Sequence, residues 1–204
     1  MNSITLQEQK ITPSKVVCIG RNYSEHIEEL NNAVPDEMVF FIKPNSSIST
    51  NLVFPKGSAS CHYEAEISFL IEEDKISAVS FGLDLTLREV QSKLKAKGLP
   101  WERAKAFDNS AVFSDFVSFD GDISKLEVEL FINDKLAQKG DVSLMINKPY
   151  DIINEFKSFA SFEDGDILMS GTPKGVGEFK KGDVFEGKIL YDNEVLLTKK
   201  FIVS

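Results

Sequence analysis

The sequence predicts an α+β fold that is mainly β, and three observations carry this prediction. Strand-like apolar segments are short and numerous, helical patterns are few, and the two kinds of segment do not alternate as in a doubly wound parallel sheet. The 204 residues are 42% hydrophobic and 27% charged, which is typical of a globular protein. Since no repeat, low-complexity tract or change of composition marks a linker, we expect residues 1–204 to form a single domain.

The N-terminal quarter predicts two strands with a helix between them. Residues 15–19 (KVVCI) form a short apolar run followed by a glycine, as in a buried strand. A short helix is expected over residues 22–30, with Asn22 as its N-cap and Glu25 three residues later, as in a capping box. Residues 39–42 (VFFI) predict the second strand, which a lysine and a proline follow.

The next segments predict a long strand and a longer helix. Over residues 62–71, alternate side chains are apolar, which places the polar ones on the opposite face of a strand. Thr86 and Glu89 have the spacing of a capping box, and the helix that they open is expected over residues 87–97. Gly98 follows this helix, as glycine commonly does at helix C-termini.

The second half of the chain is predicted to be mostly β. Residues 126–132 alternate polar and apolar side chains, and Asn133 and Asp134 then predict a hairpin turn. One helix is expected over residues 149–160. The remaining strands are predicted over residues 167–170, 184–190 and 195–203, with a turn-rich glycine segment at 171–177.

Charge and cysteine content limit the expected partners. The 32 acidic and 23 basic residues give a net charge of -9, which repels nucleic acid phosphates and anionic lipids, so neither is expected as a partner. An anionic substrate then requires a local positive group, such as a metal ion or a cluster of basic side chains. The sequence has no signal-peptide pattern and no run of about 18 apolar residues. Cys18 and Cys61 are expected to be buried free thiols, so we predict a cytoplasmic protein.

Three acidic residues are candidates for a metal site. Glu64 and Glu66 lie on one face of the predicted strand over residues 62–71. Two such carboxylates are also compatible with a solvated strand edge. Asp84 favours a site, because it lies within the apolar run 81–85, where burial without a partner is costly. An all-carboxylate ligand set favours Mg²⁺, Mn²⁺ or Ca²⁺ over Zn²⁺.

Two histidines and one lysine are candidates for proton transfer or charge stabilisation. His26 lies three residues before Glu29, so both occupy one helix face, and a carboxylate beside an imidazole is the arrangement of a general base. The same spacing also suits a surface ion pair. His62 shares the strand face of the two glutamates and is either their partner or a strand-end histidine. Lys105 lies between small and apolar residues, with a surface position as its default.

Six segments between residues 15 and 185 hold most of these candidates. They are Gly20-Arg21-Asn22-Tyr23 with His26 and Glu29; Phe41-Ile42-Lys43-Pro44; His62-Tyr63-Glu64-Ala65-Glu66; Gly82-Leu83-Asp84-Leu85-Thr86 with Arg88 and Gln91; Gly98-Leu99-Pro100-Trp101 with Lys105; and Gly171-Thr172-Pro173-Lys174-Gly175-Val176-Gly177. In this order they resemble the signatures of the fumarylacetoacetate hydrolase family. One such segment is weak evidence, whereas six in the family's order are not expected by chance.

The resemblance implies a mixed β-roll or sandwich with a few short helices, of the type in the C-terminal domain of fumarylacetoacetases, and usually a homodimer. It also implies that Glu64, Glu66 and Asp84 hold Mg²⁺ or Mn²⁺. The chain has no room for the extra N-terminal domain of the larger members, so it is similar to the small acylpyruvase-type ones.

The resemblance further implies roles in catalysis and substrate binding. His26 and Glu29 would activate a water, on a segment that closes over the substrate, and Lys105 would stabilise enolate or oxyanion charge. The implied substrate-lining residues are Arg21, Asn22, Gln91 and Thr172.

These implications predict a metal-dependent hydrolase that cleaves the carbon–carbon bond of 2,4-dioxo acids, whose carboxylate and adjacent carbonyl chelate the metal. The His26–Glu29 pair would deprotonate the attacking water, and a pyruvate enolate would leave. Two alternatives stay open. One is oxaloacetate tautomerase, oxaloacetate decarboxylase or dienedioate isomerase chemistry on the same chelate, and the other is a non-catalytic ligand-binding relative. In every case the expected partner is a small dioxo or keto acid.

Overall fold

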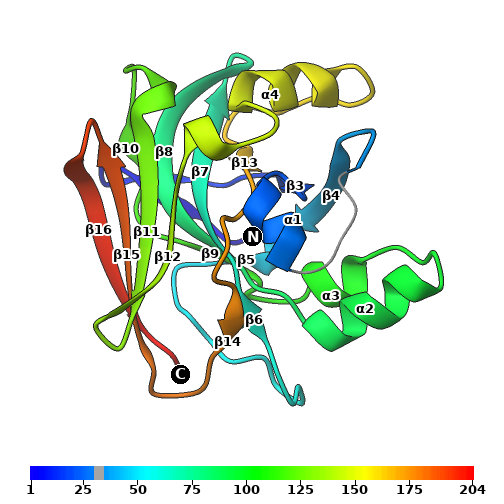
Figure 1. The fold of residues 1–204 in the computed structure, drawn as a ribbon. Coiled ribbons are helices and arrows are strands. Elements are labelled where there is room, and N and C mark those ends of the chain that lie inside the picture. Colours follow the sequence, from blue (N-terminus) through cyan, green and yellow to red (C-terminus); the bar gives the residue numbers. More distant parts are fainter. Residues whose placement is uncertain (30–34) are drawn as a thin grey trace.

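A long mixed sheet runs through the computed structural model, which describes residues 1–29 and 35–204 (Figure 1). Its strands are β3 (Lys15–Gly20), β4 (Val39–Pro44), β5 (Ile48–Ser49), β7 (Ala65–Glu72), β8 (Lys75–Asp84), β9 (Ala111–Phe113), β10 (Val117–Ser118) and β13 (Ile167–Met169). They lie in the order β4-β3-β13-β7-β8-β9-β5, with β10 paired to β8. The pairs β3–β13 and β5–β9 are parallel, and the other neighbours are antiparallel.

A second, antiparallel sheet packs against β7 and β8 (Figure 1). Its strands are β11 (Leu126–Ile132), β12 (Lys135–Asp141), β15 (Val184–Tyr191) and β16 (Glu194–Ile202), in the order β12-β11-β15-β16. Apolar side chains fill the space between the sheets. The ring of Phe81 lies over Gly187, where any side chain would collide with it, and its centroid is 6.3 Å from that of Phe201. The predicted mainly β fold with a curled mixed sheet and few short helices is thereby confirmed.

The helices and the short pairings lie around these two sheets. The helices are α1 (Ser24–Glu29), α2 (Arg88–Ala96), α3 (Glu102–Lys105) and α4 (Pro149–Lys157), and the single 3₁₀ turns are η1 (Asn45–Ser47), η2 (Ile123–Lys125) and η3 (Val142–Leu144). The two-stranded pairs are β1 (Ile4–Leu6) with β2 (Gln9–Ile11), and β6 (His62–Tyr63) with β14 (Gly177–Glu178). Helices α2 and α3 pack on each other beside β4 (Figure 1). No helix of residues 1–29 and 35–204 has the length and apolar content to cross a membrane.

Several local predictions are confirmed by turn geometry. Asn133 and Asp134 have φ values of 49° and 63°, as in the left-handed turns that suit hairpins, and they join β11 to β12. Helix α2 ends at Ala96, and Gly98 follows with φ of 63°, the left-handed conformation that closes many helices. Cys18 and Cys61 are buried free thiols.

The two predicted N-terminal caps are wrong, because both side chains have other partners. Helix α1 begins at Ser24, and the Asn22 amide donates to the carbonyl oxygens of Asn147 and Ser170 at 2.9 and 2.8 Å. The predicted end of this helix, Leu30, lies outside the described residues. Helix α2 begins at Arg88 rather than beside a Thr86 cap. The strand predicted over residues 62–71 is likewise divided, because Glu64 separates β6 from β7.

Candidate active site

Strand pairing brings three carboxylates together at one end of the main sheet. Glu64 and Glu66 flank the first residue of β7, and Asp84 is the last residue of β8. The antiparallel register joins these ends, and Asp84 N–H donates to the Glu64 carbonyl oxygen at 2.9 Å. One carboxylate oxygen from each residue lies within 4.8 Å of the others, and all three side chains are buried. The pair of glutamates is therefore not a solvated strand edge.

A buried lysine and a partly buried arginine contact this cluster. Lys105, the last residue of α3, is 3% exposed, and its Nζ lies 2.9 Å from Glu64 Oε2 and 2.5 Å from Asp84 Oδ2. Arg88 on α2 forms an ion pair with the other oxygen of Glu64. The surface position that is the default for Lys105 is thus wrong, because α3 and the loop after it place its ammonium between two buried carboxylates.

The three carboxyl groups have different electrostatic environments. Burial raises the pKa of Glu66 well above its usual value, and the neighbouring Asp84 and Glu64 raise it further. Burial would also raise the pKa of Glu64, but the adjacent Lys105 and Arg88 lower it below its usual range. Burial would lower the pKa of Lys105, yet the carboxylates of Asp84 and Glu64 raise it to about 12. The cluster therefore combines an ammonium that its carboxylate neighbours keep protonated with one carboxyl group, Glu66, whose negative charge is less stabilised by nearby cations than that of Glu64.

The donor set fits a hard divalent cation. The three oxygens lie within 4.8 Å of one another, which is close enough for one ion to contact all three after small side-chain adjustments, since Mg²⁺–oxygen distances are about 2.1 Å. Asp84 Oδ1 is buried and lies 2.8 Å from Lys43 Nζ, but it accepts no well-directed hydrogen bond from the described residues. Carboxylate oxygens alone suit Mg²⁺ or Mn²⁺ better than Zn²⁺. Glu64, Glu66 and Asp84 are the residues that would hold the ion.

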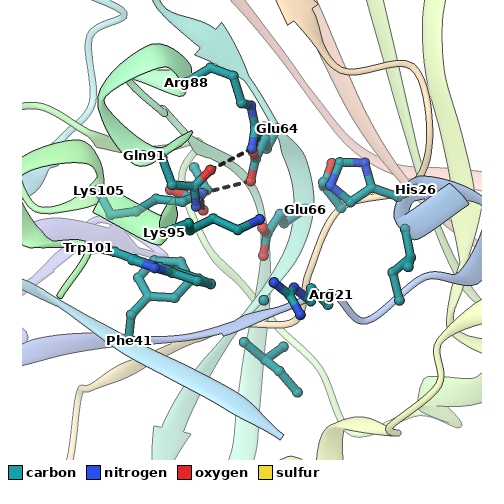
Figure 2. A pocket seen from close by; sticks show the side chains of 15 residues that line it. Arg21, His26, Phe41, Glu64, Glu66, Arg88, Gln91, Lys95, Trp101 and Lys105 are labelled. Atoms are coloured by element: carbon teal, nitrogen blue, oxygen red, sulfur yellow. Dashed lines mark hydrogen bonds and ion pairs between the residues drawn. The ribbon is translucent and has the colours of Figure 1, made fainter. Parts of the chain in front are cut away.

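A histidine on α1, His26, faces the cluster, and a glutamate of the same helix lies beside it (Figure 2 shows the histidine). His26 Nδ1 lies 3.4 Å from Glu29 Oε2, and Glu29 in turn accepts the backbone N–H of Gly175 at 3.1 and 3.2 Å. Burial lowers the pKa of His26, although Glu64 and the hydrogen bond to Glu29 oppose this. His26 is buried, whereas the Glu29 side chain is 34% exposed, so the pair joins a shielded imidazole to a carboxylate that solvent reaches. This arrangement presents a neutral imidazole to the pocket near pH 7.

The pocket around the cluster includes most of the residues predicted to contact substrate. Arg21, Gln91 and Thr172 line it. Asn22 is buried with its amide bonded to backbone, as described above, and is not among the lining residues found in the described chain. His62 lies outside the cluster, where its Nε2 is 3.8 Å from Glu178, so the strand-end alternative is the one that the structure supports.

Two functional candidates lie within the quoted segments without having been assigned a role. Lys43 is fully buried, and its Nζ contacts Asp84, the Ser110 hydroxyl and the backbone carbonyl oxygen of Lys105. Arg88 pairs with Glu64 and donates to Gln91 Oε1 at 2.7 Å. The available signal was their position in the ordered segments, since neither residue type nor spacing sets them apart from surface cations.

The comparisons with known proteins agree with this geometry. The model of the fumarylacetoacetate (FAA) hydrolase C-terminal family matches residues 15–198. The oxaloacetate tautomerase YcgM of Escherichia coli is 39% identical over 203 residues, which cover 91% of this chain and 92% of that protein.

Two solved structures show the same architecture. One, from Oleispira antarctica, carries the provisional name fumarylacetoacetate isomerase/hydrolase; it is 35% identical, with a TM-score of 0.94 and complete coverage of both chains. The other is the fumarylpyruvate hydrolase of Pseudomonas aeruginosa in complex with Mn²⁺ and pyruvate, which is 26% identical, with a TM-score of 0.90 and coverage of 99% and 95%. The chain therefore belongs to the fumarylacetoacetate hydrolase family.

Proposed function

We propose that the protein is a divalent-cation-dependent tautomerase that interconverts the keto and enol forms of oxaloacetate or a closely related 2-keto acid. The observation that carries this proposal is that a neutral base, His26, and a fixed cation, Lys105, line one pocket with the three carboxylates. Proton transfer next to a carbonyl needs a base and a group that stabilises enolate charge, and both are present. The similarity to an oxaloacetate tautomerase supports this reaction over the hydrolysis predicted from the sequence.

The chemistry requires one proton to leave the substrate and one to return. A bound Mg²⁺ or Mn²⁺ would supply charge that favours the enolate form of a chelated 2-keto acid. In the direction from keto to enol, His26 accepts a proton from the carbon beside the carbonyl and then releases it to solvent, while a proton from solvent water adds to the carbonyl oxygen. The Lys105 ammonium stabilises the negative charge that develops in between. No water is consumed and no carbon–carbon bond breaks.

Glu29 acts on this step through His26. Its carboxylate, held by the Gly175 N–H, fixes the tautomer in which Nδ1 carries the proton and the other ring nitrogen is free to accept one. Such general-base assistance typically contributes 10²–10⁴-fold to a rate. We therefore expect His26→Ala to lower the rate by about 10²-fold or more while metal binding is retained.

Hydrolysis of an acylpyruvate is the second candidate. The same His26–Glu29 pair is suited to activate a water, and the likeness to a fumarylpyruvate hydrolase supports this reaction class. Both reactions use a keto acid and the same metal site, so the substrate class is common to the two candidates. The choice between Mg²⁺ and Mn²⁺, the homodimer and the cytoplasmic location stay predictions.

The test measures three outcomes with purified protein and Mg²⁺. Loss of the enol absorbance of oxaloacetate without pyruvate release is expected, and proton NMR in D₂O should show faster exchange at the carbon beside the carbonyl. Release of pyruvate from oxaloacetate would instead show decarboxylation, and release of pyruvate and acetate from acetylpyruvate would show hydrolysis. An enol decay no faster than with Mg²⁺ alone would refute the tautomerase proposal, and Glu64→Ala serves as the control that should lose both metal and activity.

A further inference from the structure

Two cations reach the pocket from sides that the carboxylate cluster does not occupy. Lys95 lies in the last turn of α2, one turn beyond Gln91, and Arg21 follows the end of β3. Both line the same pocket as the three carboxylates, and in Figure 2 their side chains extend toward Glu66 from different sides. These positions differ from those of Arg88 and Lys105, whose charges contact Glu64 directly.

The surroundings of Lys95 fix its direction. Its Nζ lies 5.9 Å from the centroid of the Trp101 ring, and the residue is half-buried although it lies on a surface helix. Lys93 on the same helix is exposed and does not line the pocket. Contact with an aromatic ring holds an ammonium only weakly, by about 0.5–1 kcal/mol at exposed sites, so this contact orients Lys95 more than it stabilises it.

Arg21 lines the pocket from an unusual backbone position. Its φ of 59° is in the left-handed region, which a residue with a side chain rarely adopts and which costs about 1–3 kcal/mol. Burial lowers the pKa of Lys95, and the like charges of Arg21 and Arg88 lower it further. Convergent cations at the wall of a pocket are stabilised when an anion binds between them.

The charge of the lining favours a substrate with two negative charges. Four cationic side chains and three carboxylates line the pocket in the described part of the chain. A divalent ion bound by the carboxylates would add two further positive charges. A keto acid with one carboxylate places its charge at the chelating end, and nothing on it would then meet the positive wall formed by Lys95 and Arg21.

We propose that Lys95, together with Arg21, binds the second carboxylate of a dicarboxylic 2-keto acid, so that Lys95 determines specificity for such substrates over keto acids with one carboxylate. The proposal rests on the proposed function for the identity of the chelating end, and it adds the group that distinguishes oxaloacetate from keto acids with one carboxylate. The Lys95 ammonium would form a charge-assisted hydrogen bond with this carboxylate, and such a bond is stronger than a neutral one and depends on the lysine charge.

The test uses the fluorescence of Trp101, the single tryptophan of the chain, as a binding signal that does not depend on turnover. The Mg²⁺-loaded protein is titrated with oxaloacetate and with 2-oxobutyrate, which carries a methyl group in place of the second carboxylate. The His26→Ala background limits conversion of the ligand during the titration. We expect Lys95→Met to weaken oxaloacetate binding by about 10-fold or more, and to leave 2-oxobutyrate binding within about twofold.

Two matched variants complete the design. Lys93→Met removes the same charge from the exposed face of the same helix and should leave both affinities unchanged, whereas Lys95→Arg should retain the preference for oxaloacetate. Equal weakening of both ligands by Lys95→Met, or no weakening of either, would overturn the proposal. Failure of the proposed function would be recognised separately. In that case the protein would bind oxaloacetate more tightly than 2-oxobutyrate in this titration, but the wild-type protein would not accelerate oxaloacetate tautomerisation in the activity assay.

Discussion

Lys43 Nζ lies 2.8 Å from Asp84 Oδ1, and neither side chain reaches solvent. The same ammonium donates to the Ser110 carbonyl and hydroxyl oxygens at 3.1 and 3.0 Å and to the backbone carbonyl oxygen of Lys105. One buried cation on β4 thus connects a candidate metal ligand to the end of the helix that carries Lys105. The alignment of these two groups therefore depends on a residue that does not itself line the pocket.

Replacement of this cation should destabilise the fold. Lys43→Met leaves Asp84 Oδ1 buried without the ammonium beside it, while Lys105 still contacts Oδ2, and breaking a buried ion pair from one side typically costs about 3–5 kcal/mol. We expect a loss of this size in the free energy of unfolding, measured by urea denaturation at pH 7 without metal. Lys75→Met, which removes an exposed lysine from the strand that carries Asp84, is the control. Equal unfolding midpoints for the two variants would contradict the prediction.

Glu66 should affect stability and metal binding in opposite directions. Because the folded protein raises its pKa, its ionised form is disfavoured, and the folded state loses stability as the pH rises above the ordinary value of about 4.5. Without metal at pH 7, Glu66→Gln should therefore raise the melting temperature, by about 2–4 °C for each kcal/mol relieved. The increase in melting temperature that Mg²⁺ gives the wild-type protein should be lost in this variant.

Glu64→Gln is the matched control for this prediction. It removes a carboxylate whose partners are Lys105 and Arg88, so it should lower the melting temperature without metal as well as abolish the Mg²⁺ effect. Thermal denaturation followed by circular dichroism, with and without Mg²⁺, separates the two variants. The same direction of change in both would show that the electrostatic difference between the two glutamates is not as the structure indicates.

The acidic cluster shows what the sequence can predict about this site. Alternation along one strand places Glu64 and Glu66 on the same face, and the apolar neighbours of Asp84 indicate burial. The register that brings Asp84 to the same end of the sheet comes from pairing between β7 and β8, which local patterns do not encode. The resemblance to a family supplied that step.

The missed residues depend on partners that are distant in sequence. Lys43 follows an apolar strand, as many solvated lysines do, and its burial depends on oxygens of Lys105 and Ser110, more than 60 residues away. Thr86 has the spacing of a cap, but its backbone pairs with His62 and its hydroxyl accepts a hydrogen bond from the Lys105 ammonium at 2.6 Å. In both cases a tertiary contact outweighs a local preference that the sequence displays.

The pH dependence of the reaction should report His26. Burial lowers its pKa below the ordinary value of about 6.5, so the neutral, proton-accepting form persists below that pH. The acidic limb of kcat/KM should therefore have its midpoint below 6.5. In Glu29→Gln the midpoint should fall further, because the hydrogen bond to Glu29 raises this pKa. Neutral His26 also affects the free energy of unfolding. Because the folded state lowers its pKa, this contribution to stability is present above pH 6.5 and is lost as the pH falls through the pKa of the folded state.

A direct titration checks the assignment. The chain has two histidines, so a His62→Gln variant identifies the NMR signals of His26, whose midpoint should match the kinetic limb. An acidic limb above pH 6.5, or one unchanged in Glu29→Gln, would show that another group controls the reaction.

Gly175 should be required for activity because its backbone positions Glu29. It has φ of 98°, and a Cβ atom there would collide with the carbonyl oxygen of Ala137, so Gly175→Ala must move the N–H that binds both Glu29 oxygens. Gly182 also has a positive φ, of 87°, but a Cβ atom at that position would have no neighbour within 4 Å, so Gly182→Ala introduces only the backbone strain. We expect Gly175→Ala to lower kcat about as much as Glu29→Gln does, and Gly182→Ala to leave it unchanged while lowering stability by about 1–2 kcal/mol.

A double variant tests whether Gly175 acts through Glu29. If Gly175→Ala and Glu29→Gln act through the same hydrogen bond, the double variant Gly175→Ala/Glu29→Gln should lose little more activity than either single one. Independent, additive losses in kcat would instead show that the loop at Gly175 contributes to the reaction by a route other than Glu29.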